Sequence, residues 1–225
     1  MTTKRKTIPI RCGKRQQKRY SVGISSVEIH QILIKSANDL ISTASPNYQY
    51  VAARLLNMQL RKEVWGYGDR PTDFLTFLQR NVDNAIYDPI ILEKWSDEDI
   101  DTFSKYMNHE RDDLFTYAGL QQLIDKYLVK NRSTGVIHET PQFAYMSIAM
   151  CLFSTLEEVK KAYDCYSTFK INLPTPIMAG VRTNIRQFAS CVLVDVDDNL
   201  DGIFSSIHAV VKYTARRAGI GLNIG

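Results

Sequence analysis

The chain has 225 residues, of which 44% are hydrophobic, 23% are charged and 10% are aromatic. This apolar content can supply a buried core, and it excludes an intrinsically disordered chain. No stretch approaches the roughly eighteen uncharged apolar residues of a membrane-spanning helix, and the basic start lacks the apolar core of a signal peptide. A cytoplasmic protein without membrane contact is therefore expected.

The cysteines are widely spaced along the chain, at Cys12, Cys151, Cys165 and Cys191. They form neither a CxxC pair nor a grouping with histidine at the spacing of zinc ligands. No metal site is predicted, and a reducing compartment fits this pattern.

Residues 1–25 form a basic tail. Eight Lys and Arg residues precede the first acid, Glu28, so the rest of the chain is net negative although the formal net charge is +4. Such a tail could contact nucleic acid through its phosphates, with strong salt dependence. However, Tyr20 is its only stacking residue, and a solvated terminus has the same composition. Both interpretations stay open.

Residues 26–169 have mostly helical apolar spacing. Ser26 is the predicted N-cap of a helix that runs to about Leu40, and a second helix from Tyr50 to Gly66 is expected to pair with it in antiparallel fashion. Further helices are predicted over 71–91, from Ser96 onward, and over 114–128, 141–153 and 156–169. A small hairpin is predicted between 127–129 and 136–138.

The pattern changes at about residue 169. Short strands are predicted over 169–174 and 188–194, and the second is apolar on both faces, as in a buried parallel sheet. A helix over 199–217 follows. Its inward residues are expected to be Leu200, Ile203, Phe204, Ile207, Val210, Val211 and Tyr213. The glycine-rich residues 219–225 are expected to be a loop before a further strand.

Several long motifs recur in one order along the chain. They are PNYQYVAARL at 46–55, HERD at 109–112, ETPQF at 139–143, NLPTPIMAG at 172–180, RQFASCVL at 186–193 and RRAGIG at 216–221. Residues 21–225 thereby resemble the amino-terminal part of the large, catalytic subunit of class I (aerobic) ribonucleotide reductases, in a form closest to bacterial and phage members.

The resemblance implies an α+β fold with four parts. These are a basic tail (1–25), a remnant of the family's ATP-cone helices (26–68), a helical domain (69–168) and the first strands and helix of a ten-stranded α/β barrel (169–225). Two or three strands and one helix cannot close a parallel sheet, so the last part is expected to need more strands from a complementary chain.

Cys191 matches one of the family's two redox-active cysteines, which supply two electrons while a thiyl radical on a third cysteine removes the ribose 3′ hydrogen. A thiol beside the 2′ carbon can protonate the departing hydroxyl and then form a disulfide. Without its flanking motif, a lone cysteine in an apolar strand is more often a core residue.

Three residues match family positions that hold the diphosphate and ribose of the substrate: Thr175, Ser190 and Gly219. Hydroxyl groups and an unobstructed backbone amide suit phosphate oxygens. Each also has an ordinary structural explanation: Thr175 as a turn former, Ser190 as a core hydroxyl and Gly219 as a helix C-cap.

Nucleotide effectors (ATP, dATP, dTTP and dGTP) are implied at two places. Asp198, Asn199 and Leu200 match a specificity site at the dimer interface, although Asp198 could be a plain helix N-cap and the family usually has serine at position 199. Ser26 and Lys62 match two contacts of the ATP cone. Because only about 25 residues precede Ser26, the cone's first helix is expected to be missing and activity-site binding to be weak or absent.

The family's radical cysteine, its second reducing cysteine and the radical-relaying tyrosines have no counterpart in this sequence. A split or truncated large subunit is therefore expected, which works only with a complementary carboxyl-terminal chain and a metal-containing small subunit that generates the radical. The resemblance also implies a homodimer contact through the 199–217 helix, or else an internal barrel helix there. Thioredoxin or glutaredoxin would be the reductant.

A hypothesis from a different class stays open beside the reductase. The helical region could be a non-catalytic regulatory or interaction module, with the basic tail contacting nucleic acid or a protein. Only the reductase hypothesis requires Cys191 to be essential.

Overall fold

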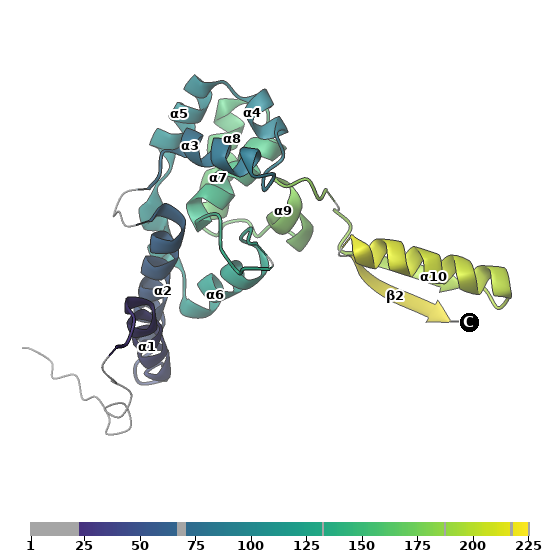
Figure 1. Cartoon of the computed structure of the whole chain (residues 1–225), viewed down its shortest axis with the longest axis horizontal. Coiled ribbons are helices and arrows are strands. Elements are labelled where there is room, and N and C mark those ends of the chain that lie inside the picture. The colour runs from purple at the N-terminus through teal and green to yellow at the C-terminus, as the bar shows by residue number, and fades with distance from the viewer. Residues whose placement is uncertain (1–22, 67–70, 132, 187, 217, 225) are drawn as a thin grey trace, which may run out of the picture.

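The computed structural model describes residues 23–66, 71–131, 133–186, 188–216 and 218–224. The protein is mostly helical and ends in a two-stranded parallel sheet (Figure 1). Residues 1–22 of the predicted basic tail (1–25) lie outside the described residues. In chain order the elements are α1 (Ser26–Asp39), α2 (Tyr48–Trp65), α3 (Phe74–Asp83), α4 (Ile90–Lys94), α5 (Asp97–Tyr106), the 3-10 helix η2 (His109–Leu114), α6 (Tyr117–Lys126), α7 (Pro141–Leu152), α8 (Leu156–Ser167), α9 (Thr175–Gly180), β1 (Cys191–Val196), α10 (Leu200–Ala215) and β2 (Gly219–Ile224).

Helix α1 begins with a capping box one residue earlier than predicted. The N-cap is Ser25, whose hydroxyl accepts a hydrogen bond from the Glu28 amide at 3.2 Å, while the Glu28 carboxylate accepts from the Ser25 amide at 2.8 Å. The capping box needs the acid three residues after the cap, which selects Ser25 over Ser26. As predicted, α1 packs against α2 through a short connection, and α2 also contacts α6 and η2.

Helix α7 is the centre of the helical domain. Its residues 141–150 are all buried, because the helix is apolar on nearly every side and its neighbours enclose it. Its Phe143 ring contacts two phenylalanines of α3, Phe74 at 5.1 Å and Phe77 at 4.4 Å between ring centroids. The helix predicted over 141–153 is thus confirmed as the core of the fold.

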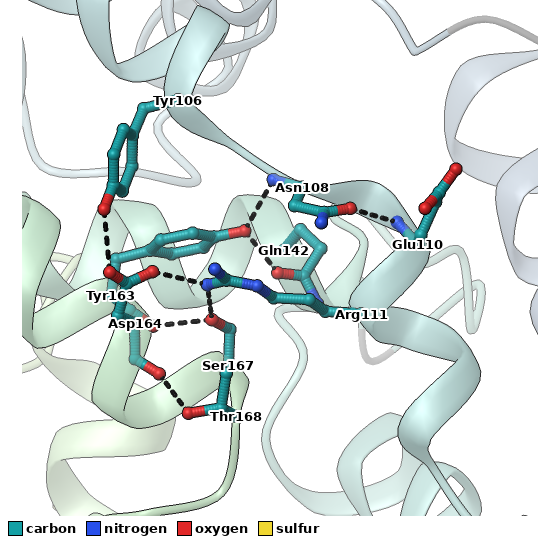
Figure 2. A network of polar contacts seen from close by, with 9 residues as sticks. All are labelled: Tyr106, Asn108, Glu110, Arg111, Gln142, Tyr163, Asp164, Ser167 and Thr168. Carbon is teal, nitrogen blue, oxygen red and sulfur yellow. Dashed lines mark hydrogen bonds and ion pairs between the residues drawn. The ribbon is translucent and has the colours of Figure 1, made fainter.

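A polar network fastens the HERD segment to α7 and α8 (Figure 2). In η2, Arg111 donates to the Asp164 carboxylate at 2.6 Å and to the Ser167 hydroxyl at 2.7 Å. The Tyr163 hydroxyl donates to the Gln142 side chain at 2.6 Å and accepts from the Asn108 amide. These bonds satisfy polar groups that the core buries, so this motif of the sequence has a structural role here.

The predicted helix over 71–91 is divided in two. Helix α3 ends at Asp83, and Ala85 then takes a φ of 54°, a left-handed conformation that a continuing helix cannot contain. Helix α4 follows after this turn. Helices α5, α6 and α8 agree with prediction apart from their ends, and the predicted hairpin is an isolated antiparallel bridge between Lys130 and Ile137.

The strand predicted over 169–174 is wrong. The amides of Lys170 and Ile171 both donate to the Cys165 carbonyl, and Phe169 has a φ of 60°, so the chain turns tightly around the end of α8. The Phe169 ring packs on Phe115 with a centroid distance of 4.7 Å. This aromatic contact stabilises the turn. Its apolar residues alternate as they do in a strand, which is why the sequence predicted a strand here.

Residues 191–224 form a strand-helix-strand unit that projects from the helical body (Figure 1). Strands β1 and β2 pair in parallel, in a register that runs from Cys191 opposite Gly219 to Val196 opposite Ile224. The glycine-rich end is therefore a strand, which corrects the expected loop. Helix α10 contacts both strands, and its hydroxyl at Ser206 donates to the Asp195 carbonyl at 3.3 Å.

Six of the seven α10 residues that were predicted to be inward are exposed, whereas Val210 is half-buried. Among them, Leu200, Phe204 and Val211 are 73%, 67% and 62% exposed, and on β1 Leu193 is 86% exposed. Apolar periodicity identifies a helix face but not what covers it. The parallel pairing of β1 is confirmed, whereas its expected burial is not. None of the helices in the described part of the chain is long and apolar enough to cross a membrane.

His109 gives the helical domain an acid-sensitive stability. Its ring packs edge-on against Trp65 and Phe143, and both centroid distances are 5.4 Å. Burial, and then the charge of Arg61, lowers the pKa of His109 to about 4. In the unfolded chain its pKa returns to about 6.5, so the unfolded state binds more protons between these values.

We therefore predict that the free energy of unfolding falls as pH decreases from about 6.5 through 4, with roughly 3 kcal/mol of the loss due to this histidine. Urea unfolding at several pH values should show a flatter pH dependence for His109→Leu than for the wild type. The matched control is His208→Leu, at an exposed histidine of α10. Equal pH dependence in the wild type and His109→Leu would contradict this assignment.

Candidate functional site

Thr175 is the first residue of the short helix α9, which follows Pro174. The side chain of Thr175 is exposed, and its hydroxyl lies 3.4 Å from the hydroxyl of Tyr127, at the end of α6. The alternative that Thr175 only forms a turn is therefore wrong, because this residue begins a helix. The hydroxyl is available to an incoming ligand.

A buried ion pair holds α9 in place. Arg182 is 1% exposed and Glu139 is fully buried, and the guanidinium donates to both carboxylate oxygens, with a distance of 2.8 Å from Nε to Oε2. Glu139 also accepts from the Tyr87 hydroxyl and, at 2.6 Å, from the Val129 amide. Burial, and then the negative charge of Glu139, raises the pKa of the Tyr87 phenol. This phenol therefore stays protonated and donates to the carboxylate.

The remaining donors of Arg182 reach backbone carbonyls. One bonds to Met178 in α9 at 2.6 Å, and another bonds to Tyr127 at 3.1 Å. The backbone carbonyl of Arg182 itself accepts from the Asp88 amide at 2.9 Å, and Asp88 forms an ion pair with Arg186 at 2.7 Å. The segment between α9 and the strand unit is therefore attached to the helical body as far as Arg186.

Cys191, Ser190 and Gly219 lie together at the start of the parallel sheet. Cys191 is opposite Gly219 in the register, and the Gly219 amide donates to the Ser190 carbonyl at 2.9 Å. A Cβ on Gly219 would lie 3.1 Å from that carbonyl oxygen, so this close approach of two backbones favours glycine. The C-cap of α10 is Arg216, which corrects the alternative of Gly219 as a helix cap.

Cys191 and Ser190 are both exposed. In the described residues neither is a core side chain, so the structural alternatives for these two positions are wrong. By contrast, Cys151 is mostly buried, and burial raises the pKa of its thiol to about 11. Of these cysteines, Cys191 is the one with a thiol open to solvent.

Thr175 and Cys191 lie on different units. Thr175 is at the edge of the helical body, whereas Cys191 begins the projecting strand unit, and residues 181–190 connect them (Figure 1). Among the described residues, the proposed substrate positions therefore fall into two groups: Thr175 alone, and Ser190 with Cys191 and Gly219. Among the hydrogen bonds of Thr175, Ser190 and Gly219 in the described part of the chain, none joins the two groups.

The predicted specificity-effector residues mark the start of α10. Asn199 is the N-cap, and its side chain accepts from the Gly202 amide at 2.8 Å. Asp198 is therefore not the cap, and its carboxylate is exposed beside Leu200. A Cβ on Gly202 would meet the Asp197 side chain at 2.6 Å, so this turn requires glycine in α10.

Ser26 and Lys62 are exposed near the same end of the antiparallel pair α1 and α2. A cavity of about 430 Å³ lies between these helices and α6, and neither residue lines it. A larger cavity, of about 690 Å³, lies between the 128–138 bridge region, the end of α3 and the segment after α9. It is lined by Tyr127 but not by Thr175 or Cys191.

The sequence analysis missed Arg182, Tyr127 and the role of Glu139. Arg182 and Glu139 are 43 positions apart, and local periodicity carries no information about such pairs. Arg182 could still have been noticed, because it directly follows the apolar residues 177–181, and a charge that enters a core needs a partner of opposite charge.

Comparison with known proteins identifies the domain to which α9 and the buried ion pair belong. The family described as ribonucleotide reductase, all-alpha domain, matches residues 113–186, which run from η2 through α9. The matched segment therefore contains Glu139, Thr175 and Arg182.

Longer matches extend to the strand unit. The ribonucleoside-diphosphate reductase subunit alpha of Haemophilus influenzae is 48% identical over 209 residues, 90% of this chain and 28% of that protein. The ribonucleoside-diphosphate reductase 1 subunit alpha of Escherichia coli is 47% identical over 209 residues, 90% of this chain and 27% of its own length. The alpha subunit of Enterobacteria phage T4 is 46% identical over 208 residues, 90% of this chain and 28% of its own. The chain thus spans under a third of the length of these relatives.

We predict that Arg182→Met lowers the free energy of unfolding by about 3–5 kcal/mol, because it leaves the Glu139 carboxylate buried without its cation. Chemical denaturation measures this change. The control, Lys105→Ala, removes an exposed ion pair with Asp101 and should have little effect. An Arg182→Met protein as stable as the wild type would show that the pair does not hold the domain together.

Thiol labelling should distinguish the cysteines. In a short reaction with iodoacetamide at pH 8, Cys191 should be modified well before Cys151, which is half-buried and has a raised pKa. Mass spectrometry of the digested protein gives the extent of reaction at each site. Equal rates at the two positions would contradict the exposure described for β1.

Proposed function

Because this chain belongs to the ribonucleoside-diphosphate reductase alpha family, over its amino-terminal part, we propose that it supplies one of the two reducing cysteines and part of the substrate site of such an enzyme. A ribonucleoside-diphosphate reductase is an oxidoreductase. The proposed reaction converts ribonucleoside diphosphates to deoxyribonucleoside diphosphates by radical chemistry.

The observation that carries this proposal is the position of Cys191. Its thiol is exposed at the first residue of β1, beside Ser190 and opposite Gly219, where a ligand can approach the sheet. In the proposed step, the 2′ hydroxyl of the ribose leaves as water, while the Cys191 thiol and a second cysteine thiol are oxidised to a disulfide. Two electrons pass from the cysteine pair to the substrate.

Substrate binding is proposed to divide between the two units. The Thr175 hydroxyl on α9 would donate to the diphosphate, and the Ser190 and Gly219 positions would hold the ribose and phosphate near Cys191. These groups would meet on one ligand if the strand unit moved against the helical body, to which the connecting segment is attached only as far as Arg186. The ligand would then bridge the two units.

The strand unit is proposed as the start of the family's α/β barrel and as a subunit contact. Four exposed apolar residues of α10 follow one another at intervals of four, three and four positions, which places them on one face of the helix: Leu200, Phe204, Ile207 and Val211. Such a face suits a homodimer contact, and Asp198, Asn199 and Leu200 at its start would contact the effector nucleotide there. Ser26 and Lys62 are proposed as weak activity-site contacts.

The reaction also requires a radical, further active-site residues and a reductant, and we propose that other polypeptides supply them. A radical would come from a metal-containing small subunit, further barrel residues from the rest of the alpha polypeptide or from a complementary chain, and electrons from thioredoxin or glutaredoxin. The residues described here would bind the substrate and reduce it.

The test is Cys191→Ser in the assembled reductase that contains this chain. We predict that reduction of CDP with ATP as effector falls to background, because serine cannot form the disulfide. Assembly and the folded state, checked by gel filtration and circular dichroism, should be retained. The control is Cys165→Ser, at a half-buried cysteine of α8, which should keep its activity. Normal turnover by Cys191→Ser would refute the redox role and favour a non-catalytic interaction module.

A further inference from the structure

Tyr127 contacts both Thr175 and Arg182, the arginine that holds α9 in place. Its side-chain hydroxyl lies 3.4 Å from the Thr175 hydroxyl at the start of α9. Its backbone carbonyl accepts a hydrogen bond from Arg182, at 3.1 Å. Tyr127 is also the C-cap of α6, where its amide donates to the Leu123 carbonyl at 2.9 Å. Backbone bonds on both sides therefore fix where this tyrosine can place its ring.

The other end of α9 is held by the same guanidinium. Arg182 donates to the Met178 carbonyl at 2.6 Å, in the turn that follows Thr175. Since Arg182 is itself fixed by the buried Glu139, both α9 and Tyr127 are attached to one rigid point. The separation between the two hydroxyl groups is thus set by the buried ion pair, with little dependence on the exposed surface.

Two hydroxyls in contact can divide the donor and acceptor roles in two ways. A phenol is a stronger hydrogen-bond donor than an aliphatic alcohol, because its oxygen is more acidic. When Tyr127 donates to the Thr175 oxygen, the Thr175 hydrogen is left free to donate elsewhere. A phosphate oxygen, which can only accept, is then the matching partner for Thr175.

We propose that Tyr127 is a positioning residue, which orients the Thr175 hydroxyl as a hydrogen-bond donor toward the diphosphate of the substrate. This inference rests on the role proposed above for Thr175. It assigns to Tyr127 no contact with the reacting atoms, and it predicts an effect on substrate binding and none on the chemical step.

The experiment is a double-mutant cycle in the assembled reductase, with Tyr127→Phe, Thr175→Ala and the two combined. Tyr127→Phe should raise the KM for CDP about three- to tenfold, the range for one neutral hydrogen bond, with kcat unchanged. The double variant should bind no more weakly than Thr175→Ala alone, because without the Thr175 hydroxyl there is nothing for Tyr127 to orient.

The matched control is Tyr106→Phe. It also removes one tyrosine hydroxyl of the helical domain, which donates to Asp164 of α8 at 2.7 Å and takes no part in the hydrogen bonds of Thr175 or Arg182. The KM for CDP should not change in this variant. Thermal unfolding of Tyr127→Phe should stay close to that of the wild type, since the ring and the backbone bonds remain.

The outcomes separate the inference from the proposal on which it rests. An unchanged KM for Thr175→Ala would remove the diphosphate role of Thr175, and the inference with it. A raised KM for Thr175→Ala beside an unchanged KM for Tyr127→Phe would overturn the inference alone. Additive effects in the double variant would also overturn it, because they would show that Tyr127 acts independently of Thr175.

Discussion

The buried ion pair between Arg182 and Glu139 is the interaction on which the placement of the site depends. One guanidinium, with no access to solvent, binds the carboxylate of Glu139 just before α7, a carbonyl of α9 and the carbonyl of Tyr127. A buried charge pair of this kind contributes little net stability, but the loss of either partner is costly. Its main consequence is geometric, because it fixes α9 against the core of the domain.

This arrangement leaves the candidate site in two parts with different mechanical properties. The part that carries Thr175 belongs to a packed helical body, in which α7 is buried almost entirely. The part that carries Cys191 and Gly219 is a small parallel unit with one helix, whose apolar residues such as Leu193 and Phe204 are exposed. A sheet of two strands needs further packing to be stable, which agrees with its proposed place at the start of a barrel.

Much of the helical fold follows from the sequence, because caps and periodicity are local signals. The capping box at Ser96 and Asp99 and the long apolar run of α7 after Pro141 identify their helices without tertiary information. The strand predicted over 169–174 is wrong, because the alternation of apolar residues around Phe169 fits a turn as well as a strand. Cys191 and Thr175 could be predicted as site residues only from the motifs that surround them. The pairing of Arg182 with Glu139 could not be predicted, because it is a long-range contact that no local pattern encodes.

We propose that Cys191 is oxidised when substrate is reduced. A single turnover of the assembled reductase without external reductant, followed by rapid alkylation and mass spectrometry of the peptide that contains Cys191, measures this directly. We predict that Cys191 is recovered in a disulfide, in proportion to the deoxyribonucleotide formed. Recovery of Cys191 as a free, alkylated thiol after product has formed would contradict it.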